Sequence, residues 1–203
     1  FPVGRRLGAA SLVLFAALLA ALPLASGRVG GHALELVAAF YRAGALVFGG
    51  GHVVLPLLDA AVVGPGWVSR GEFLAGYGAV QAMPGPLFTF SSYLGAAGGP
   101  EPNGVVGSAL ATVAIFLPSF LLLAALGPLW SAYRGRPGVR AALAGIGAAV
   151  VGLLAAGLWD PVLTGSVDSV WDAVLALAFL AALRVLPIWA VVLAAAGLGA
   201  VLF

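Results

Sequence analysis

The sequence contains no cysteine and no lysine, and only 8% of its 203 residues are charged. Without cysteine the chain can form no disulfide framework, thiol redox centre or cysteine-ligated metal site. Soluble domains carry roughly 25% charged residues, so the composition excludes an ordinary soluble domain. The net charge of +2 is spread too thinly along the chain to indicate binding to nucleic acid.

Patterns typical of catalysis are also missing. The two histidines, His32 and His52, are 20 residues apart, which is a poor spacing for a metal site, and no other candidate ligands support them. The sequence has no G-x-x-x-x-G-K-[ST] loop, so the chain does not hydrolyse a nucleoside triphosphate itself. We therefore expect a protein that is not an enzyme and that holds no metal or cofactor.

Apolar residues make up 63% of the chain. Several runs approach the ~20 apolar residues that a helix needs to cross a bilayer. The sequence predicts an all-α fold, a polytopic membrane helical bundle of about four to six spans with two broken or re-entrant helix hairpins. We expect one domain over residues 1–203, with a first span at 7–24, broken helices at 34–63 and 70–97, and the remaining spans within 105–203.

The first apolar run follows Arg5 and Arg6, as in a signal peptide. No small-residue cleavage site followed by a soluble domain comes after it, which favours a true span. We expect that span to end at Pro23. The chain starts at Phe1 rather than Met, which is expected of a piece cut from a longer protein.

Each of the two broken helices is interrupted near its middle. The first break is Gly49-Gly50-Gly51, where each glycine costs about 1 kcal/mol of helix propensity, and the second is Pro84-Gly85-Pro86. Each half has only about 10 to 15 residues, too few to cross ~30 Å, so we favour re-entrant hairpins over broken full spans. Irregular backbone at membrane depth survives only where protein buries it or where it lines a wet cavity. Packing kinks are the alternative reading.

The two breaks have the features of an anion site. The half-helices that start at His52 and Leu87 direct free N–H groups and positive dipole ends into the breaks. The hydroxyls of Thr89, Ser91 and Ser92 follow the second break and can donate to a tetrahedral oxyanion. Paired discontinuous helices commonly build the substrate site of transporters. The predicted substrate-binding residues are Arg42, Gly49, Gly50, Gly51, His52, Gln81, Pro84, Gly85, Pro86, Thr89, Ser91 and Ser92.

Arg42 stands in an apolar helix, where an arginine costs about 2.5 kcal/mol or more. It balances an anion, pairs with Glu72, or extends to the interface. Gln81 bonds either the loop backbone of the second break or the substrate. His52, Asp59 and Glu72 are candidates for proton coupling. For each there is a structural alternative: His52 caps a half-helix, Asp59 lies at the interface, and Glu72 completes an S-x-x-E capping box with Ser69, the reading we favour for it.

Charge gives an orientation. Arg134, Arg136 and Arg140 cluster in one short loop, which the positive-inside rule places in the cytoplasm with Arg5 and Arg6. The acidic residues Glu101, Asp160 and Asp168 then fall on the opposite side. The count of crossings agrees with this orientation whether the broken helices are hairpins or full spans.

Three strings carry a resemblance to a known family: AFYRAGALVFGGGHVVLPLL, GWVSRGEFLAGYGAVQAMPGPLFTFSSYLGA and AIFLPSFLLL. With them the chain, from about Leu34 to Phe203, resembles the chromate ion transporter (CHR, ChrA-type) family, and specifically the C-terminal half of a long-chain member. The resemblance implies a secondary transporter that exports chromate, a sulfate-like tetrahedral oxyanion, across the bacterial cytoplasmic membrane. It also implies an ion gradient or anion exchange as the driving force, and a homodimer or pairing with a homologous inverted half.

Two other functions stay open from the sequence. A passive anion channel would move chromate down its gradient and ignore a proton uncoupler. A non-transporting half would only complete a partner's site, and would tolerate Arg42→Ala and Gly50→Leu.

Overall fold

The structure is a computed structural model that describes residues 4–48, 53–83, 85–133, 135–164, 167 and 169–202. These residues form helices and include no strand, so the predicted all-α membrane fold is confirmed. Among the described residues, three helical stretches are long and apolar enough to cross a membrane: Arg6–Val29, Gly104–Gly127 and Pro137–Asp160. The same part of the chain contains shorter apolar helices at Val54–Val63, Val170–Ala182 and Ile188–Ala200.

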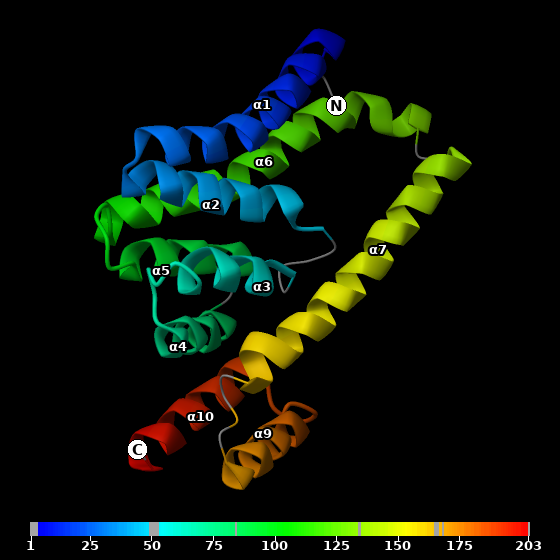
Figure 1. Cartoon of the computed structure of the whole chain (residues 1–203). Helices are drawn as coiled ribbons and strands as arrows, with labels where there is room; N and C mark the ends of the chain where they lie inside the picture. Colours follow the sequence, from blue (N-terminus) through cyan, green and yellow to red (C-terminus); the bar gives the residue numbers. More distant parts are fainter. Residues whose placement is uncertain are drawn as a thin grey trace.

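The elements follow one another along the chain with short connections (Figure 1). Their bounds are α1 Arg5–Val29, α2 His32–Leu46, α3 Val54–Leu58, the π-helix η2 Asp59–Val63, α4 Arg70–Gln81, the 3₁₀-helix η3 Leu87–Thr89, α5 Phe90–Ala97, α6 Gly104–Tyr133, α7 Pro137–Gly157, the π-helix η4 Leu158–Leu163, α9 Val170–Ala182 and α10 Ile188–Leu202.

Two helices begin at a serine cap, and one helix continues past the proline at which we expected it to end. Ser69 begins α4 with the predicted capping box, and Ser169 with Asp172 begins α9 in the same way. The expected end of the first span at Pro23 is wrong, because α1 continues through Pro23 to Val29. A proline removes one helical N–H donor, and in a membrane helix neighbouring groups can compensate for it. The carbonyl that loses its donor is that of Leu19, four residues before Pro23. The Ser26 hydroxyl donates instead to the Pro23 carbonyl at 3.0 Å, an added bond in the turn that follows the proline.

The core consists mainly of buried side chains from α2, α3, α4, α5 and the first half of α6, and α2 and α5 pack directly against α6. Its largest fully buried side chains include Phe40, Tyr41, Phe73, Phe90 and Ile115. In Figure 1, α1, α2 and α6 lie together, α3 and α5 are beside them, and α7 leads away to α9 and α10. The C-terminal helix α10 contacts α4 and α9.

The two ends of the bundle differ in charge as expected. Gly8 of α1 lies against Ala124 and Ala125 of α6, so α1 and α6 run antiparallel. Arg6 and the loop after α6, which contains Arg136, therefore share one end of the bundle. Glu101 lies at the other end, in the loop between α5 and α6.

Candidate functional site

The chain reverses direction at both predicted breaks. The first hairpin, residues 32–63, consists of α2, α3 and η2. Trp67, just after η2, packs edge-on against His32 at the start of α2, with ring centroids 4.5 Å apart. The start of α2 and the residues just after η2 therefore lie together, so the chain turns back between α2 and α3.

The second hairpin, residues 70–97, consists of α4, η3 and α5. The Tyr93 hydroxyl of α5 donates to the Glu72 carbonyl of α4 at 3.1 Å. One turn deeper, the Phe73 and Phe90 rings meet edge-to-face at 5.1 Å. These contacts make α4 and α5 antiparallel neighbours, with the Pro-Gly-Pro break at the far end of the pair.

Described residues of both hairpins lie beside the same part of α6. Gly44, in the last turn of α2, lies against the backbone of Ile115. Phe88, just after the second break, packs against Phe116 with ring centroids 5.5 Å apart. Because Ile115 and Phe116 are neighbours in α6, the last turn of α2 and the first turn after the second break lie at the same depth along that helix.

Part of the predicted site lies outside the described residues, namely Gly49, Gly50, Gly51, His52 and Pro84. Of the second break, Gly85 and Pro86 are exposed. The Pro86 carbonyl accepts a hydrogen bond from the Thr89 hydroxyl at 2.8 Å, so Thr89 holds the first turn after the break.

The other two predicted hydroxyls are engaged within the protein. Ser91 is fully buried, and its hydroxyl donates to the Phe88 carbonyl at 2.7 Å. Ser92 is half-buried and shares a hydrogen bond with Ser108 of α6 at 2.6 Å. In this conformation Thr89 and Ser92 are therefore closer to the surface than Ser91.

Arg42 lies on α2, one turn before the end of that helix and seven residues before the first break. Its side chain lines a groove of about 260 Å³ between α2 and the α3–η2 segment, opposite Leu57, Ala60 and Ala61. Among the described residues, no carboxylate lies within ion-pair distance of its guanidinium. The pairing of Arg42 with Glu72, one of the three readings left open by the sequence, is not observed.

Glu72 takes the structural role that the sequence favoured. Its carboxylate accepts hydrogen bonds from the Ser69 hydroxyl at 2.6 Å and from the Ser69 backbone amide at 3.0 Å. These two bonds hold the pKa of Glu72 below its ordinary value, because they stabilise the charged form. The Glu72 carboxylate therefore caps the start of α4.

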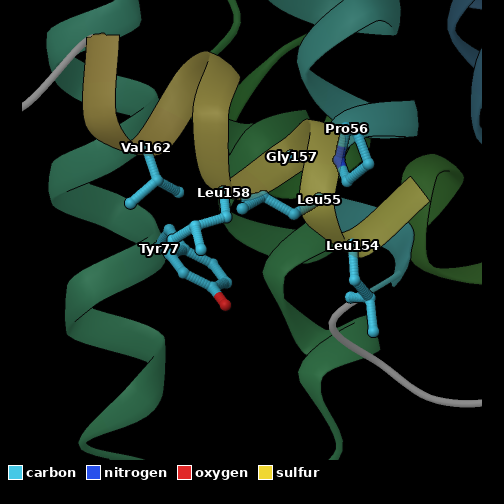
Figure 2. A pocket seen from close by; sticks show the side chains of 7 residues that line it. All are labelled: Leu55, Pro56, Tyr77, Leu154, Gly157, Leu158 and Val162. Atoms are coloured by element: carbon cyan, nitrogen blue, oxygen red, sulfur yellow. The ribbon is translucent and has the colours of Figure 1, made fainter. Parts of the chain in front are cut away.

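Gln81 lies at the end of α4, just before the second break. Its amide donates to the Tyr77 hydroxyl at 3.2 Å. Tyr77 also lines a small pocket of about 140 Å³ where α3 and α4 meet the end of α7 (Figure 2). The pocket is otherwise apolar, with Leu55, Pro56, Leu154, Gly157, Leu158 and Val162 as its other lining residues.

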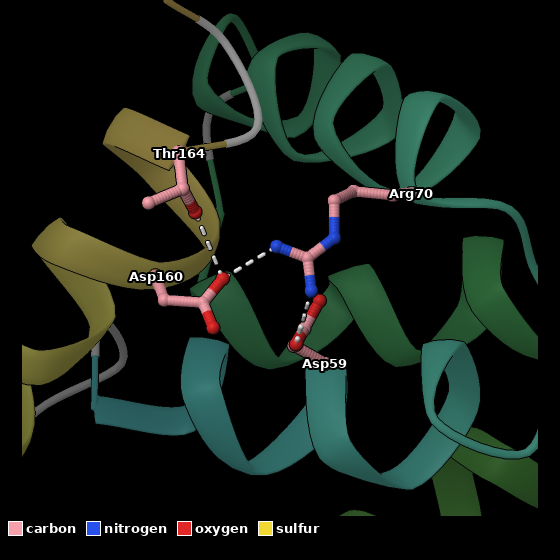
Figure 3. Close-up of polar contacts among 4 residues, drawn as sticks. All are labelled: Asp59, Arg70, Asp160 and Thr164. Atoms are coloured by element: carbon pink, nitrogen blue, oxygen red, sulfur yellow. Dashed lines mark hydrogen bonds and ion pairs between the residues drawn. The ribbon is translucent and has the colours of Figure 1, made fainter.

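Asp59 belongs to a charged cluster that sequence reasoning missed. Arg70 lies between Asp59 of the first hairpin and Asp160 of η4, and the Thr164 hydroxyl donates to Asp160 (Figure 3). The sequence contained only a weak signal for the cluster, an arginine directly after a helix cap. Asp160 is 90 residues away from Arg70 in the chain, and no local pattern relates the two.

Comparison with known proteins gives the site its context. The family model described as chromate transporter matches residues 34–200. The chain belongs to the chromate transporter family. The match begins at the first hairpin and extends into α10, so it includes both breaks and α6. The predicted resemblance is thus confirmed.

Individual relatives carry the same description. The chain is 34% identical over 149 residues to a chromate transport protein of Pseudomonas aeruginosa, covering 73% of this chain and 35% of the relative. A probable chromate transport protein of Synechococcus elongatus is 38% identical over 123 residues, covering 60% and 30%. A chromate transport protein of Cupriavidus metallidurans is 34% identical over 127 residues, again covering 60% and 30%.

These matches cover about a third of each relative's length. That partial coverage fits the prediction that the chain corresponds to half of a long-chain family member. No solved structure matches the chain.

Proposed function

We propose that the chain forms part of a secondary transporter that exports chromate, or another sulfate-like tetrahedral oxyanion, across the bacterial cytoplasmic membrane. Family membership supports the substrate class. One structural observation carries the mechanism: the last turn of α2 and the first turn after the second break lie at the same depth along α6, and Arg42, seven residues before the first break, has no carboxylate partner among the described residues. A bound dianion would supply the negative counter-charge that the Arg42 guanidinium lacks among the described residues.

The two hairpins are proposed to be re-entrant. Both enter and leave at the end of the bundle that holds Trp67, an aromatic side chain suited to the membrane interface. Gly44, in the last turn of α2, and Phe88, just after the second break, lie beside Ile115 and Phe116, while α6 continues to Tyr133. Hairpins that end at mid-depth place half-helix ends and loop backbone where a substrate crossing the membrane would meet them.

The proposed oxyanion site joins the two breaks. Arg42 supplies the positive charge, and the partly exposed hydroxyls of Thr89 and Ser92 turn from their present partners, the Pro86 carbonyl and Ser108, to donate to the anion. Ser91, being fully buried, supports the first turn of α5 rather than contacting the anion in this conformation. The rest of the site comprises Gly49, Gly50, Gly51, His52, Gln81, Pro84, Gly85 and Pro86.

Transport is proposed to be driven by an ion gradient or by anion exchange. Asp59 is the best supported of the three coupling candidates, because its carboxylate is largely buried and one of its oxygens has no hydrogen-bond partner in the described part of the chain. Glu72 is the weakest candidate, since it caps α4. His52 lies outside the described residues.

A second function is favoured by one observation. The chain spans about a third of the relatives' length, so a half that only completes a partner's site is the alternative. The proposed partner is a second copy or a homologous inverted half. Transport by the chain alone distinguishes a self-sufficient homodimer from this alternative.

The test is chromate uptake into everted membrane vesicles that contain the chain, with and without a proton uncoupler and with sulfate as competitor. We expect saturable uptake that sulfate inhibits, and Arg42→Ala to raise the half-saturating chromate concentration at least ten-fold, as for a lost charge-assisted bond of about 1.5 kcal/mol or more. Arg184→Ala, which removes an exposed arginine far along the chain, is the matched control. Unchanged affinity in a correctly inserted Arg42→Ala protein would remove Arg42 from the site.

The uncoupler separates the driving forces. Uptake that the uncoupler abolishes supports proton coupling, whereas uptake that resists it but responds to sulfate supports exchange or a channel. Absence of uptake from well-inserted protein would favour the non-transporting half, and co-expression with a homologous half should then restore it.

A further inference from the structure

Arg70 lies at the start of α4 between two carboxylates from other elements. Its Nη1 atom donates to Asp160 Oδ1 at 2.5 Å, and its Nη2 atom is 3.7 Å from Asp59 Oδ2 (Figure 3). Asp59 belongs to the first hairpin and Asp160 follows the end of α7. A single guanidinium therefore ties the second hairpin both to the first hairpin and to α7.

The two carboxylates hold Arg70 unequally. Asp160 is exposed and accepts a second hydrogen bond from Thr164. The Asp59 side chain is only 16% exposed, its Oδ2 atom meets Arg70 at a loose 3.7 Å, and its buried Oδ1 atom has no partner among the described residues. If Asp160 moves away, the Arg70 guanidinium can move closer to Asp59, whose Oδ1 atom has no hydrogen-bond partner among the described residues. Arg70 can thus form an ion pair with Asp160 or with Asp59, and neither arrangement leaves a buried charge without a nearby opposite charge.

The attachment of α7 to the hairpins is small. Within α7, whose residues are all described, Gly157 alone is buried, and it lies against Pro56 of α3. Beside that contact is the apolar pocket of Figure 2. The chain then bends at Asp160, whose φ of −134° and ψ of 119° are not helical. One apolar contact and one exposed ion pair thus account for much of the docking, and exposed ion pairs are easily broken.

We propose that Arg70 is a positioning residue of the transporter, and that the Arg70–Asp160 pair is an ionic latch that opens when α7 moves away from the hairpins in each transport cycle. The proposal rests on the proposed transport function. It assigns Arg70 no contact with the transported anion. Its consequence is that transport requires the latch both to form and to break.

A disulfide that holds α7 in its docked position tests the breaking step. A Cβ atom on Gly157 would lie 3.5 Å from the Cβ of Pro56, within the range that disulfides require. The chain has no cysteine of its own, so Pro56→Cys/Gly157→Cys introduces the only possible bridge and leaves Asp59, Arg70 and Asp160 intact. We expect chromate uptake by this variant to fall at least ten-fold on oxidation and to recover on reduction. Full uptake by the fully oxidised protein would overturn the latch.

Two controls accompany the disulfide. Each single cysteine variant, treated with the same oxidant, should keep its uptake. Gly8→Cys/Ala125→Cys, treated with a short bifunctional thiol reagent, joins α1 to α6, where the Gly8 Cβ would lie 3.8 Å from the Ala125 Cα, and does not involve α7. This cross-link should leave uptake unchanged. If both cross-linked pairs lose uptake equally, movement of α7 is not the cause and the proposal fails.

Substitution of Arg70 tests the forming step. We expect Arg70→Ala to lower the maximal rate of chromate uptake several-fold with the half-saturating concentration unchanged, and Arg70→Lys to restore part of the rate. A raised half-saturating concentration at full maximal rate would make Arg70 a substrate ligand and overturn its positioning role. Unchanged kinetics would overturn it too.

A distance measurement between α1 and α7 tests the latch independently of transport activity. Spin labels on cysteines at Val13 of α1 and Val151 of α7, both more than half exposed, report the separation of the two helices. Arg70→Ala should broaden this distance distribution and add a longer population. A distribution that matches the unsubstituted protein overturns the latch. If the unsubstituted chain takes up no chromate, the proposed function fails while this measurement still decides on the latch.

Discussion

Gly44 of α2 packs directly on the backbone of Ile115 in α6. A Cβ atom at position 44 would lie 2.9 Å from the Ile115 carbonyl carbon and closer still to its oxygen. No flexible side chain can move aside there, because the obstacle is the backbone of another helix. Small residues allow helices in membranes to approach this closely. This contact places the last turn of α2 beside the first half of α6.

Gly44→Val is therefore expected to separate α2 from α6. Overpacking of this kind costs about 1–3 kcal/mol, so the melting temperature in detergent should fall. Gly145→Val is the matched control, since it introduces the same side chain into α7, where a Cβ atom would meet nothing within 4 Å. Equal melting temperatures for the two variants would contradict the close contact.

Phe90 is expected to be the main packing residue of the second hairpin. It is 1% exposed, and its ring contacts those of Phe73, Tyr77 and Tyr93. Phe90→Ala should cost about 3–5 kcal/mol. Phe120→Ala, on the exposed face of α6, should cost much less. Thermal unfolding of both variants checks this, and similar losses would mean that Phe90 is not in the core.

The capping box of α4 predicts a dependence on pH. Hydrogen bonds from Ser69 lower the pKa of Glu72, so their stabilisation is fully present above the unfolded pKa of about 4.5 and is lost as the pH falls through the lower folded value. Ser69→Ala should lower the melting temperature at neutral pH by about 2–4 °C. The difference from the unsubstituted protein should shrink in acid.

Ser169→Ala removes the equivalent cap from α9, away from the hairpins. It should lower the melting temperature without changing chromate uptake. A Ser69→Ala penalty that stays constant from neutral pH to pH 3 would show that the Glu72 carboxylate does not contribute.

Thr89 is expected to influence the proposed oxyanion site more than Ser91. Thr89→Val keeps the side-chain shape but removes the hydroxyl beside the second break, and loss of one hydrogen bond of about 1 kcal/mol should raise the half-saturating chromate concentration roughly five-fold. Ser91→Ala should have a smaller effect, since the Ser91 hydroxyl is buried on the Phe88 carbonyl. Uptake kinetics check the order, and the reverse order would mean that the hairpin opens to expose Ser91.

The order of the helices was predictable because its signals are local. Apolar run length indicates the spans, and the Ser69–Glu72 spacing indicates the start of α4. Pro23 was misread because the rule that a proline ends a helix holds for isolated helices, whereas in a membrane helix the surroundings can compensate for the missing N–H, and α1 continues to Val29. The Ser169 cap carried the same signal as Ser69 and could have been found.

The candidate site was only partly predictable. Arg42 and Thr89 are marked by polarity within apolar sequence, a property that a single position reveals. Whether a given hydroxyl is open to a substrate depends on what packs over it. The burial of Ser91 and the engagement of Ser92 by Ser108 follow from the α5–α6 contact, which no pattern within the second hairpin contains.

The sequence alone determined the membrane class, the helical content, the two breaks and the family resemblance, because composition, periodicity and motif strings are properties of neighbouring residues. The tertiary structure decided which distant residues meet. It brought Gly44 to Ile115, gave Arg70 two carboxylates from opposite parts of the chain, and left Arg42 without an ionic partner among the described residues. Such pairings depend on how helices pack against one another, and one helix's sequence does not specify the neighbour it will meet.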